Sequence, residues 1–500
     1  MPLHDTIDAS NAILHAPSWK RLSGTFQTRS VVAGVLICVH LWLANSLAAQ
    51  SPSTEIPRAE LAVLYQTELK DRYDESKLDQ LLVTHRLLEQ FFAERSSGKR
   101  MEILQQLEQG PVDPITLGRM CRIRLHWPDL PGGVYYVSER VGPHTVAYFL
   151  GLPEGYTRAK AWPLVVRLPP TDAFARQPAP DQQEVARIYT GWLNEEIKQH
   201  TDAVVLMPLM NFDHLFGPSY AGVNAVMQPV FHAAERANID PARVHLIGHS
   251  AGGHAAWNLA LHYPTYFASF NALAGSAKNE FQRVRLKILR NTWPIVWHDA
   301  DDELIKVDMS RQIVRALRAQ KVDVDYEETK GLGHRPPMQL VDKMYAKLRK
   351  RVRSLYPAEV TIQSNRLDPI YNRADWLQID QPTRAGDDQP VFFTRGTEKI
   401  VLQTGVWSAT AVIKPRNQIE VRTDNVELLR LFLNEQMLDF DRAMSVRVNG
   451  RVCFEGFARP NVATLLNDQL FMGRGWRSFP AVIELDLAPR AATRPSEEPK

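Results

Sequence analysis

Three residue types that together perform nucleophilic catalysis follow one another in a fixed order along this chain. Ser250 stands at the centre of a Gly-His-Ser-Ala-Gly segment, and Asp302 and His334 come after it. A serine hydroxyl is a poor nucleophile near neutral pH, so it needs a histidine to take its proton and a carboxylate to orient that histidine. The order serine, acid, histidine therefore predicts an activated serine at position 250.

The residues on either side of Ser250 predict a strand, a sharp turn and a helix. Residues 244–249 form an apolar run, and residues 253–262 have a helical pattern. A Gly-x-Ser-x-Gly segment at such a junction is typical of a nucleophile elbow, in which strand and helix nearly touch. Gly248 and Gly252 supply the room for that approach. The backbone N–H of Ala251 is then a candidate donor to an oxyanion.

Two later loops carry the candidate acid and base. A segment Trp-His-Asp-Ala-Asp-Asp ends at Asp302 after one predicted strand, and Lys-Gly-Leu-Gly-His ends at His334 after the next. Both loops open at the carboxyl ends of strands, where ligands bind in parallel sheets. Asp299, Asp301 and Glu303 share the acid loop with Asp302. We assign the orienting role to Asp302 and interpret Asp301 as a solvated side chain.

Short apolar runs alternate with helical patterns between residues 133 and 356. Predicted strands span residues 134–139, 145–151, 164–168, 203–207, 244–249, 267–273, 295–298 and 322–327. Predicted helices span residues 183–199, 224–237, 253–262, 310–320 and 337–355. This alternation favours a mostly parallel, eight-stranded α/β sheet covered on both faces, with Ser250 after the fifth strand.

The flanking regions have different patterns. Residues 50–132 show apolar spacings of three and four, which predict a helical pre-domain. Residues 357–488 contain short alternating runs, and Asn449-Gly450 between two of them indicates a tight hairpin. We therefore expect a C-terminal all-β, sandwich-like domain there, followed by a flexible tail at residues 489–500.

The first 49 residues resemble a signal peptide or a membrane anchor. Basic residues precede the apolar run at 31–43, and small residues at 46–49 precede a polar stretch. Export to the periplasm or the medium is expected, and membrane contact only if this segment stays uncleaved. Cys38 would leave with the segment, while Cys121 and Cys453 either form a disulfide or remain two buried thiols.

Composition narrows the choice of partners and cofactors. The chain has 500 residues, of which 59 are basic and 56 acidic, and its net charge of +3 does not favour a nucleic-acid partner. His245, His249 and His254 are spaced so that they do not converge as metal ligands need to. We expect neither a metal nor a cofactor.

Residues 239–253, together with the acid and histidine loops, resemble the α/β-hydrolase superfamily over roughly residues 133–355. The resemblance is to secreted esterases of the polyhydroxybutyrate-depolymerase and feruloyl-esterase type, and to the catalytic domain of prolyl-oligopeptidase-like (S9) peptidases. It implies a Ser250–His334–Asp302 triad, an acyl-enzyme and a small or polymeric ester substrate. An S9-like peptidase is the alternative, although no segment is long enough for the β-propeller of that family.

One departure from the family concerns the second oxyanion donor. Members usually carry His-Gly after the third strand, where this chain has Pro169-Pro170, and proline has no N–H to donate. Thr171 is the remaining candidate. A weakened enzyme, or a binding protein that kept the fold, is therefore a further alternative. In the β domain Trp407, Phe471 and Trp476 either stack on carbohydrate or brace the core.

Overall fold

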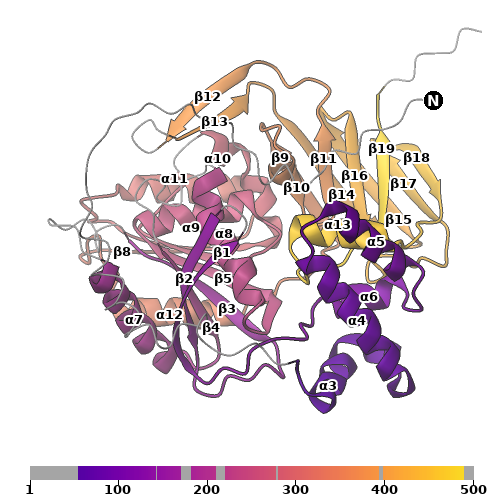
Figure 1. Ribbon diagram of the computed structural model, residues 1–500. Helices are drawn as coiled ribbons and strands as arrows, with labels where there is room; N and C mark the ends of the chain where they lie inside the picture. Colours follow the sequence, from indigo (N-terminus) through magenta and orange to yellow (C-terminus); the bar gives the residue numbers. More distant parts are fainter. Residues whose placement is uncertain are drawn as a thin grey trace, which may run out of the picture.

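The computed structural model describes residues 55–141, 144–170, 182–209, 220–277, 280–393 and 398–488. Three regions follow one another along the chain, as Figure 1 shows. A group of helices comes first, a sheet covered by helices follows, and two further sheets complete the molecule. The expected sequence of helical, α/β and β regions is therefore present.

The central sheet has eight strands in the order β1-β2-β4-β3-β5-β6-β7-β8. These strands are β1 (Gly133–Val141), β2 (His144–Leu152), β3 (Trp162–Leu168), β4 (Val204–Pro208), β5 (Ile239–His249), β6 (Ser269–Leu273), β7 (Trp293–Asp299) and β8 (Asp325–Thr329). Strand β2 is antiparallel to both of its neighbours, and all pairs from β4 to β8 are parallel. Parallel pairing brings the carboxyl ends of β5, β7 and β8 to one edge.

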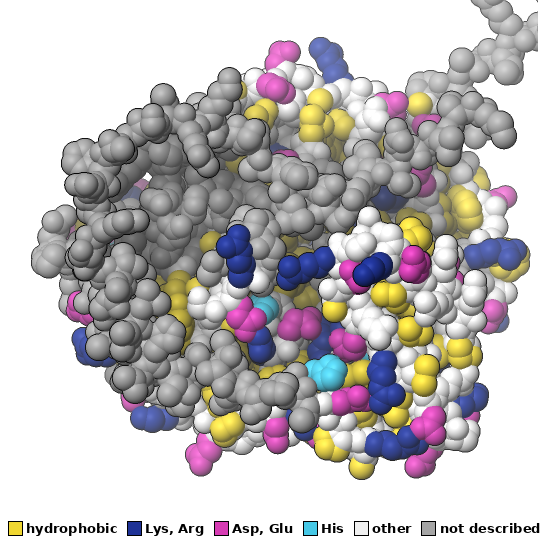
Figure 2. Space-filling model, viewed as in Figure 1, with side chains coloured by type: hydrophobic (Ala, Val, Ile, Leu, Met, Phe, Trp, Pro, Cys, Tyr) yellow, Lys and Arg dark blue, Asp and Glu magenta, His cyan; other side chains and the backbone are white. Residues whose placement is uncertain are grey.

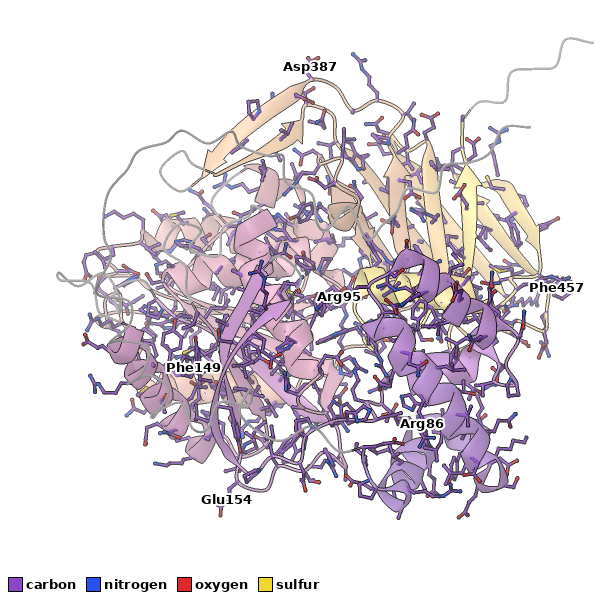
Figure 3. All side chains as sticks on the ribbon, viewed as in Figure 1. Arg86, Arg95, Phe149, Glu154, Asp387 and Phe457 are labelled. Atoms are coloured by element: carbon purple, nitrogen blue, oxygen red, sulfur yellow. The ribbon has the colours of Figure 1, made fainter. Side chains whose placement is uncertain are left out.

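Helices cover both faces of this sheet. They are α7 (Gln182–Gln199), α8 (Tyr220–Ala234), α9 (Ala251–His262), α10 (Glu280–Val284), α11 (Val307–Ala319) and α12 (Met338–Arg349), with a 3₁₀ turn at Leu286–Asn291. Leu246 belongs to one buried cluster with residues of α8 and α9, whereas Ile247 belongs to another with residues of α12. This alternation along β5 explains why the strand is apolar throughout. Phe149 lies on β2, where Figure 3 labels it. Its ring packs on Tyr189 of α7, with ring centroids 5.3 Å apart.

The N-terminal helices complete their core with a helix from the far end of the chain. They are α3 (Arg58–Leu69), α4 (Leu78–Ala93), α5 (Ser97–Glu108) and α6 (Pro114–Met120), with 3₁₀ turns at Lys70–Arg72 and Glu75–Lys77. Their buried cluster includes Leu465 and Leu466 of α13 (Val462–Met472). The pre-domain therefore packs against the C-terminal domain, and α13 contacts both α5 and α6.

The C-terminal domain contains two main sheets and a separate hairpin. One sheet has the order β10-β11-β16-β19, the other β18-β17-β15-β14-β9, and β12 pairs with β13. The strands are β9 (Glu359–Ser364), β10 (Arg373–Ala374), β11 (Leu377–Gln381), β12 (Asp388–Phe393), β13 (Glu398–Gln403), β14 (Trp407–Lys414), β15 (Gln418–Asp424), β16 (Leu428–Leu433), β17 (Met444–Val448), β18 (Arg451–Gly456) and β19 (Ala481–Asp486), with a 3₁₀ turn at Pro369–Asn372. Asn449 and Gly450, both at positive φ, join β17 to β18 as the predicted hairpin turn.

One sequence expectation about this domain needs adjustment, and the role of its aromatic residues can be decided between the two alternatives in favour of bracing. Helix α13 interrupts the expected all-β pattern. Its Val462, Leu465 and Leu466 follow helical spacing, and Asn461 caps it by accepting a hydrogen bond from the Thr464 N–H. Trp407 and Trp476 are 0% and 3% exposed, so they pack inside the molecule and cannot stack on a surface ligand. Phe471 is also packed against the core.

Charges of both signs are mixed on the outer surface seen in Figure 2, and the two described cysteines do not pair. In the described part of the face in Figure 2, basic and acidic side chains are interspersed rather than gathered by sign. Cys121 is buried and Cys453 is exposed, and neither forms a disulfide, so one of the two expected buried thiols is at the surface. None of the described helices combines the length and apolar character that a membrane span requires. Residues 1–49 lie outside the described residues.

Candidate active site

Ser250 occupies a strained turn between β5 and α9. Its backbone has φ +57° and ψ −117°, values that a residue with a side chain rarely adopts. The Ser250 N–H donates to the Leu273 carbonyl oxygen at 2.9 Å, and the Ser250 carbonyl oxygen accepts from the His254 N–H at 3.0 Å. The turn is therefore fixed from both sides, with the serine at the carboxyl end of β5.

Close backbone contact around the turn explains why glycines flank the serine. A methyl group added at Gly248 would collide with the carbonyl of Gly252, and one added at Gly252 would collide with the carbonyl of Leu168 at the end of β3. Gly253 similarly packs against the Leu273 carbonyl, 2.8 Å from where its Cβ would lie. The turn at Ser250 therefore packs directly against the end of β3, next to Pro169.

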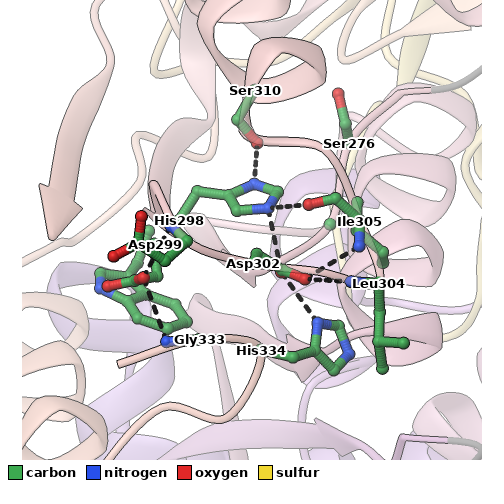
Figure 4. Close-up of polar contacts among 12 residues, drawn as sticks. Ser276, His298, Asp299, Asp302, Leu304, Ile305, Ser310, Gly333 and His334 are labelled. Atoms are coloured by element: carbon green, nitrogen blue, oxygen red, sulfur yellow. Dashed lines mark hydrogen bonds and ion pairs between the residues drawn. The ribbon is translucent and has the colours of Figure 1, made fainter. Parts of the chain in front are cut away.

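Asp302 and His334 are hydrogen-bonded to one another. His334 Nδ1 lies 2.8 Å from Asp302 Oδ2, although 32 residues separate them in sequence. Both side chains are nearly inaccessible to solvent, with 6% and 0% exposure. Oδ1 of the same carboxylate accepts from the N–H groups of Leu304 and Ile305 at 2.9 and 2.8 Å (Figure 4). The carboxylate is therefore fixed by its own loop while it holds the imidazole.

The histidine loop is anchored by two residues whose roles the sequence did not reveal. Asp299 accepts from the Leu332 and Gly333 N–H groups at 3.1 and 3.0 Å, and from the Thr329 hydroxyl at 2.7 Å. His249, the neighbour of Ser250, donates through Nε2 to the carbonyl oxygen of His334 at 2.7 Å. The position of His334 is thus tied both to the end of β7 and to the elbow.

Both buried carboxyl groups remain ionised near neutral pH. Burial raises the pKa of Asp302, but hydrogen bonds from Ile305 and His334 outweigh it and lower the pKa below the ordinary value. Burial also acts on Asp299, where hydrogen bonds from the Thr329 hydroxyl and from backbone N–H groups again leave the pKa lowered. Each therefore accepts hydrogen bonds as a carboxylate.

The remaining predicted residues are placed only in part. Ala251 begins α9, where the first N–H groups of a helix have no partner within the helix. Thr171 lies outside the described residues. No hydrogen bond between the Ser250 hydroxyl and His334 is present among the described contacts. In resting enzymes such bonds are often long and shorten only with substrate.

The three histidines near the elbow have separate partners. His245 Nδ1 lies 2.8 Å from the Ser269 hydroxyl, and His254 Nδ1 lies 2.7 Å from the Ser276 carbonyl oxygen. His249 bonds to the histidine loop as described above. Each ring is thus used to fix a neighbouring segment, which is a structural role.

Comparison with known proteins bears on the core alone. Residues 216–339 match the model of the family named Esterase. No curated protein matches the sequence.

Solved structures that resemble the core include three hydrolases, each aligned over 44% of this chain. A thermostable esterase is 19% identical with a TM-score of 0.36, and 63% of its own length is covered. The S-formylglutathione hydrolase FrmB of Staphylococcus aureus is 15% identical over 98% of its length, with a TM-score of 0.33. Dipeptidyl peptidase 4 of Porphyromonas gingivalis is 10% identical over 36% of its length, with a TM-score of 0.33.

The family match coincides with the part of the fold that carries the serine turn. It begins before α8 and ends within α12, so it includes Ser250, Asp302 and His334. The order of the eight strands and the strained serine after β5 are those of the α/β-hydrolase fold. The central region of the chain therefore has the α/β-hydrolase fold, and residues 216–339 within it match the Esterase family model.

Proposed function

We propose that this protein is an exported serine hydrolase that cleaves carboxylic esters through an acyl-enzyme. The observation that carries the proposal is the strained Ser250 at the same sheet edge as a buried, hydrogen-bonded Asp302–His334 pair. A strained backbone at a serine is retained where the surrounding structure supports it, typically at functional sites. The Esterase family match favours acyl transfer.

The reaction begins with proton transfer and attack. Asp302 holds Nδ1–H of His334, so the lone pair of Nε2 is free to take the proton of Ser250 Oγ. Oγ bonds to the ester carbonyl carbon, and the π electrons of that carbonyl move onto its oxygen. The N–H groups of Ala251 and Thr171 stabilise this oxyanion.

Collapse of the tetrahedral intermediate completes acylation. The electron pair returns from the oxyanion to re-form the carbonyl, the bond to the alcohol oxygen breaks, and the leaving alcohol takes the proton from His334. Water then attacks the acyl-enzyme while His334 accepts one of its protons, and that proton returns to Ser250 Oγ as the carboxylic acid leaves. No cofactor takes part in this sequence.

The substrate is proposed to be a small or polymeric ester encountered outside the cytoplasm. This part of the proposal depends on the N-terminal segment, residues 1–49, whose basic and apolar pattern favours export. Any carbohydrate contact of the β domain would have to use residues other than the buried Trp407 and Trp476.

The test is covalent labelling with a fluorophosphonate, which reacts with activated serines. Wild type should label, whereas Ser250→Ala and His334→Ala should not, because one lacks the nucleophile and the other its base. Ser276→Ala is the matched control, since Ser276 is 1% exposed and its hydroxyl donates to the Met309 carbonyl oxygen. It should label like wild type.

Two outcomes would contradict the proposal. If wild type folds but does not label, Pro169-Pro170 has removed too much oxyanion stabilisation, and a binding role replaces catalysis. If it labels but cleaves peptide anilides rather than p-nitrophenyl esters, the S9-like peptidase alternative replaces the esterase. Labelling together with ester cleavage supports the proposal.

A further inference from the structure

His298 is a fully buried histidine that contacts both the Asp302 carboxylate and the backbone of the loop that carries it. It lies on β7, and its side chain is 0% exposed. Its Nε2 is 3.1 Å from Asp302 Oδ2 and 2.8 Å from the carbonyl oxygen of Ile305. Its Nδ1 is 2.7 Å from the hydroxyl of Ser310 in α11. Figure 4 shows the ring between Ser310 and Asp302, with His334 beyond the carboxylate.

These partners fix which nitrogen carries the proton. The Ile305 carbonyl oxygen can only accept, so Nε2 of His298 must be the protonated nitrogen. Nδ1 of the neutral ring then accepts from the Ser310 hydroxyl. The Nε2–H donates to the Ile305 carbonyl oxygen, and Asp302 Oδ2 lies 3.1 Å from the same nitrogen, so the positive end of the N–H dipole faces the carboxylate.

The carboxylate of Asp302 has polar contacts at both oxygens. Oδ1 accepts from the N–H groups of Leu304 and Ile305, and Oδ2 is hydrogen-bonded to His334. The second polar contact of Oδ2 is with Nε2 of His298, 3.1 Å away. His298 therefore shares the charge on Oδ2 with His334 and helps to hold that oxygen in place.

Other charged groups near His298 are occupied elsewhere. Glu328 on β8 is in register with His298, but it forms a forked pair with Arg311 at 2.6 and 3.0 Å. Asp299, the next residue along β7, accepts from the histidine loop as described above. Asp302 is thus the carboxylate to which His298 is directed.

We propose that His298 is a positioning residue that holds Asp302 Oδ2 toward His334 and moderates the basicity of the catalytic histidine. Ser310, His298, Asp302 and His334 then form one continuous chain of polar contacts running from α11 to the imidazole of His334. The inference rests on the proposed function, because its kinetic consequence requires His334 to be the base. Removal of His298 leaves Oδ2 less well oriented but more strongly charged, which favours the protonated form of His334.

The experiment compares His298→Leu, which has no donor, with His298→Gln, whose amide N–H can reach the position of Nε2. For hydrolysis of p-nitrophenyl acetate, His298→Leu should lower kcat about 10-fold to 100-fold, because the polar contact that holds the charged Asp302 Oδ2 is lost, with little change in KM. The acid limb of its profile of kcat against pH should move to higher pH. His298→Gln should recover most of the rate and return the limb toward wild type.

A matched control separates positioning from general stability. His245 is a second buried histidine on the sheet, 1% exposed, and its Nδ1 lies 2.8 Å from the Ser269 hydroxyl rather than from a carboxylate. His245→Leu should lower the midpoint of thermal unfolding without moving the acid limb. Ser310→Ala tests the chain from its outer end and should give a smaller change in the same direction as His298→Leu.

Several results would overturn the inference. One is an unchanged kcat and acid limb in His298→Leu. Another is an equal loss in the Leu and Gln variants with the limb in place, because that pattern reflects packing alone. If His298→Leu does not fold, Ser310→Ala decides the question by the position of its limb.

Titration of ¹⁵N-histidine signals by NMR makes the test independent of turnover. The His334 signals should titrate at higher pH in His298→Leu than in wild type, and an unchanged midpoint refutes the inference. If wild type neither labels with fluorophosphonate nor cleaves esters, the proposed function fails, yet this comparison still decides whether His298 acts on the Asp302–His334 pair.

Discussion

Gly248 and Gly252 determine how closely β5 and α9 approach on either side of Ser250. Both lack the side-chain atom that would collide with a carbonyl group across the turn. Their role is steric rather than conformational, because neither adopts a positive φ, whereas Ser250 does. The strain of the turn is thus borne by Ser250 itself and supported by the glycines that surround it.

Gly248→Ala should therefore destabilise the protein and impair the site. Overpacking against the Gly252 carbonyl is expected to cost about 1–3 kcal/mol and to displace Ser250, which lowers fluorophosphonate labelling. Gly191→Ala in α7 is the control, because nothing lies within 4 Å of its Cβ position. That exchange should stabilise by roughly 0.5–1 kcal/mol. Equal urea midpoints for the two variants would contradict the steric account.

At the level of elements, the end of β7 organises the loop that follows β8. Asp299, the last residue of β7, accepts hydrogen bonds from the backbone of the loop that carries His334. Asp302, three residues later, bonds to the imidazole itself. One strand end thus supplies both the anchor of the histidine loop and the partner of the histidine.

Exchange of Asp299 should cost more than exchange of its exposed neighbour Asp301. Asp299→Ala removes the acceptor of partly buried donors at Leu332, Gly333 and Thr329, at a cost of at most about 1–3 kcal/mol for each group that stays unpaired. The loop then loses its position, and ester hydrolysis should fall at least about 10-fold, a loss that corresponds to roughly 1.4 kcal/mol. Asp301→Ala should stay within about 0.5 kcal/mol of wild type. Urea unfolding and initial rates measure both effects, and similar rates for the two variants would refute the anchoring role.

Local patterns were sufficient to predict the eight strands and the serine turn, because alternation and the glycine spacing are properties of adjacent residues. The role of Asp299 could not be predicted in this way. In a loop with four acidic residues, spacing does not tell which carboxylate points at the histidine and which at its backbone. Helix α13 could have been predicted from the sequence, because the apolar residues within 462–472 follow helical spacing after Asn461. The surrounding region is otherwise typical of strands.

At the scale of the whole molecule, partly or fully buried ion pairs join the three regions. Arg474, just after α13, forms a forked pair with Glu89 of α4 at 2.6 and 2.9 Å. Arg353, after α12, forms a pair with Asp375 at 2.6 Å, with side chains only 1% and 2% exposed. Because an unpaired buried charge is costly, such pairs favour one relative arrangement of the regions. The N-terminal and C-terminal regions therefore stabilise the arrangement of the molecule around the central sheet.

Glu89 should make the assembly sensitive to acid. Burial raises its pKa, but the hydrogen bond and charge of Arg474 outweigh this and lower the pKa from 4.5 to about 2. The unfolded chain therefore binds a proton between these values that the folded chain does not, so stability is present above pH 4.5 and is lost as the pH falls toward 2.

Glu89→Gln should be less stable than wild type at pH 7, by on the order of 2–3 kcal/mol, because Arg474 stays buried without its partner charge. The difference should shrink below pH 4.5, where wild type loses the same interaction. Urea unfolding at pH 7 and pH 3 measures both values. Glu195→Gln is the control, since its pair with Lys198 is 68–70% exposed and should contribute less than about 1 kcal/mol. A difference that stays constant with pH would refute the role of Glu89.

The packing of α13 against the first helices also dictates when those helices can become stable during synthesis. Glu89 and Arg474 are 385 residues apart in sequence. Ribosomes add about 5–20 residues per second, so α13 is synthesised on the order of tens of seconds after α3 to α6, and their apolar faces stay uncovered for that time. Throughout that interval they are exposed to premature association. We therefore expect the newly made N-terminal helices to need protection from association until α13 has been synthesised.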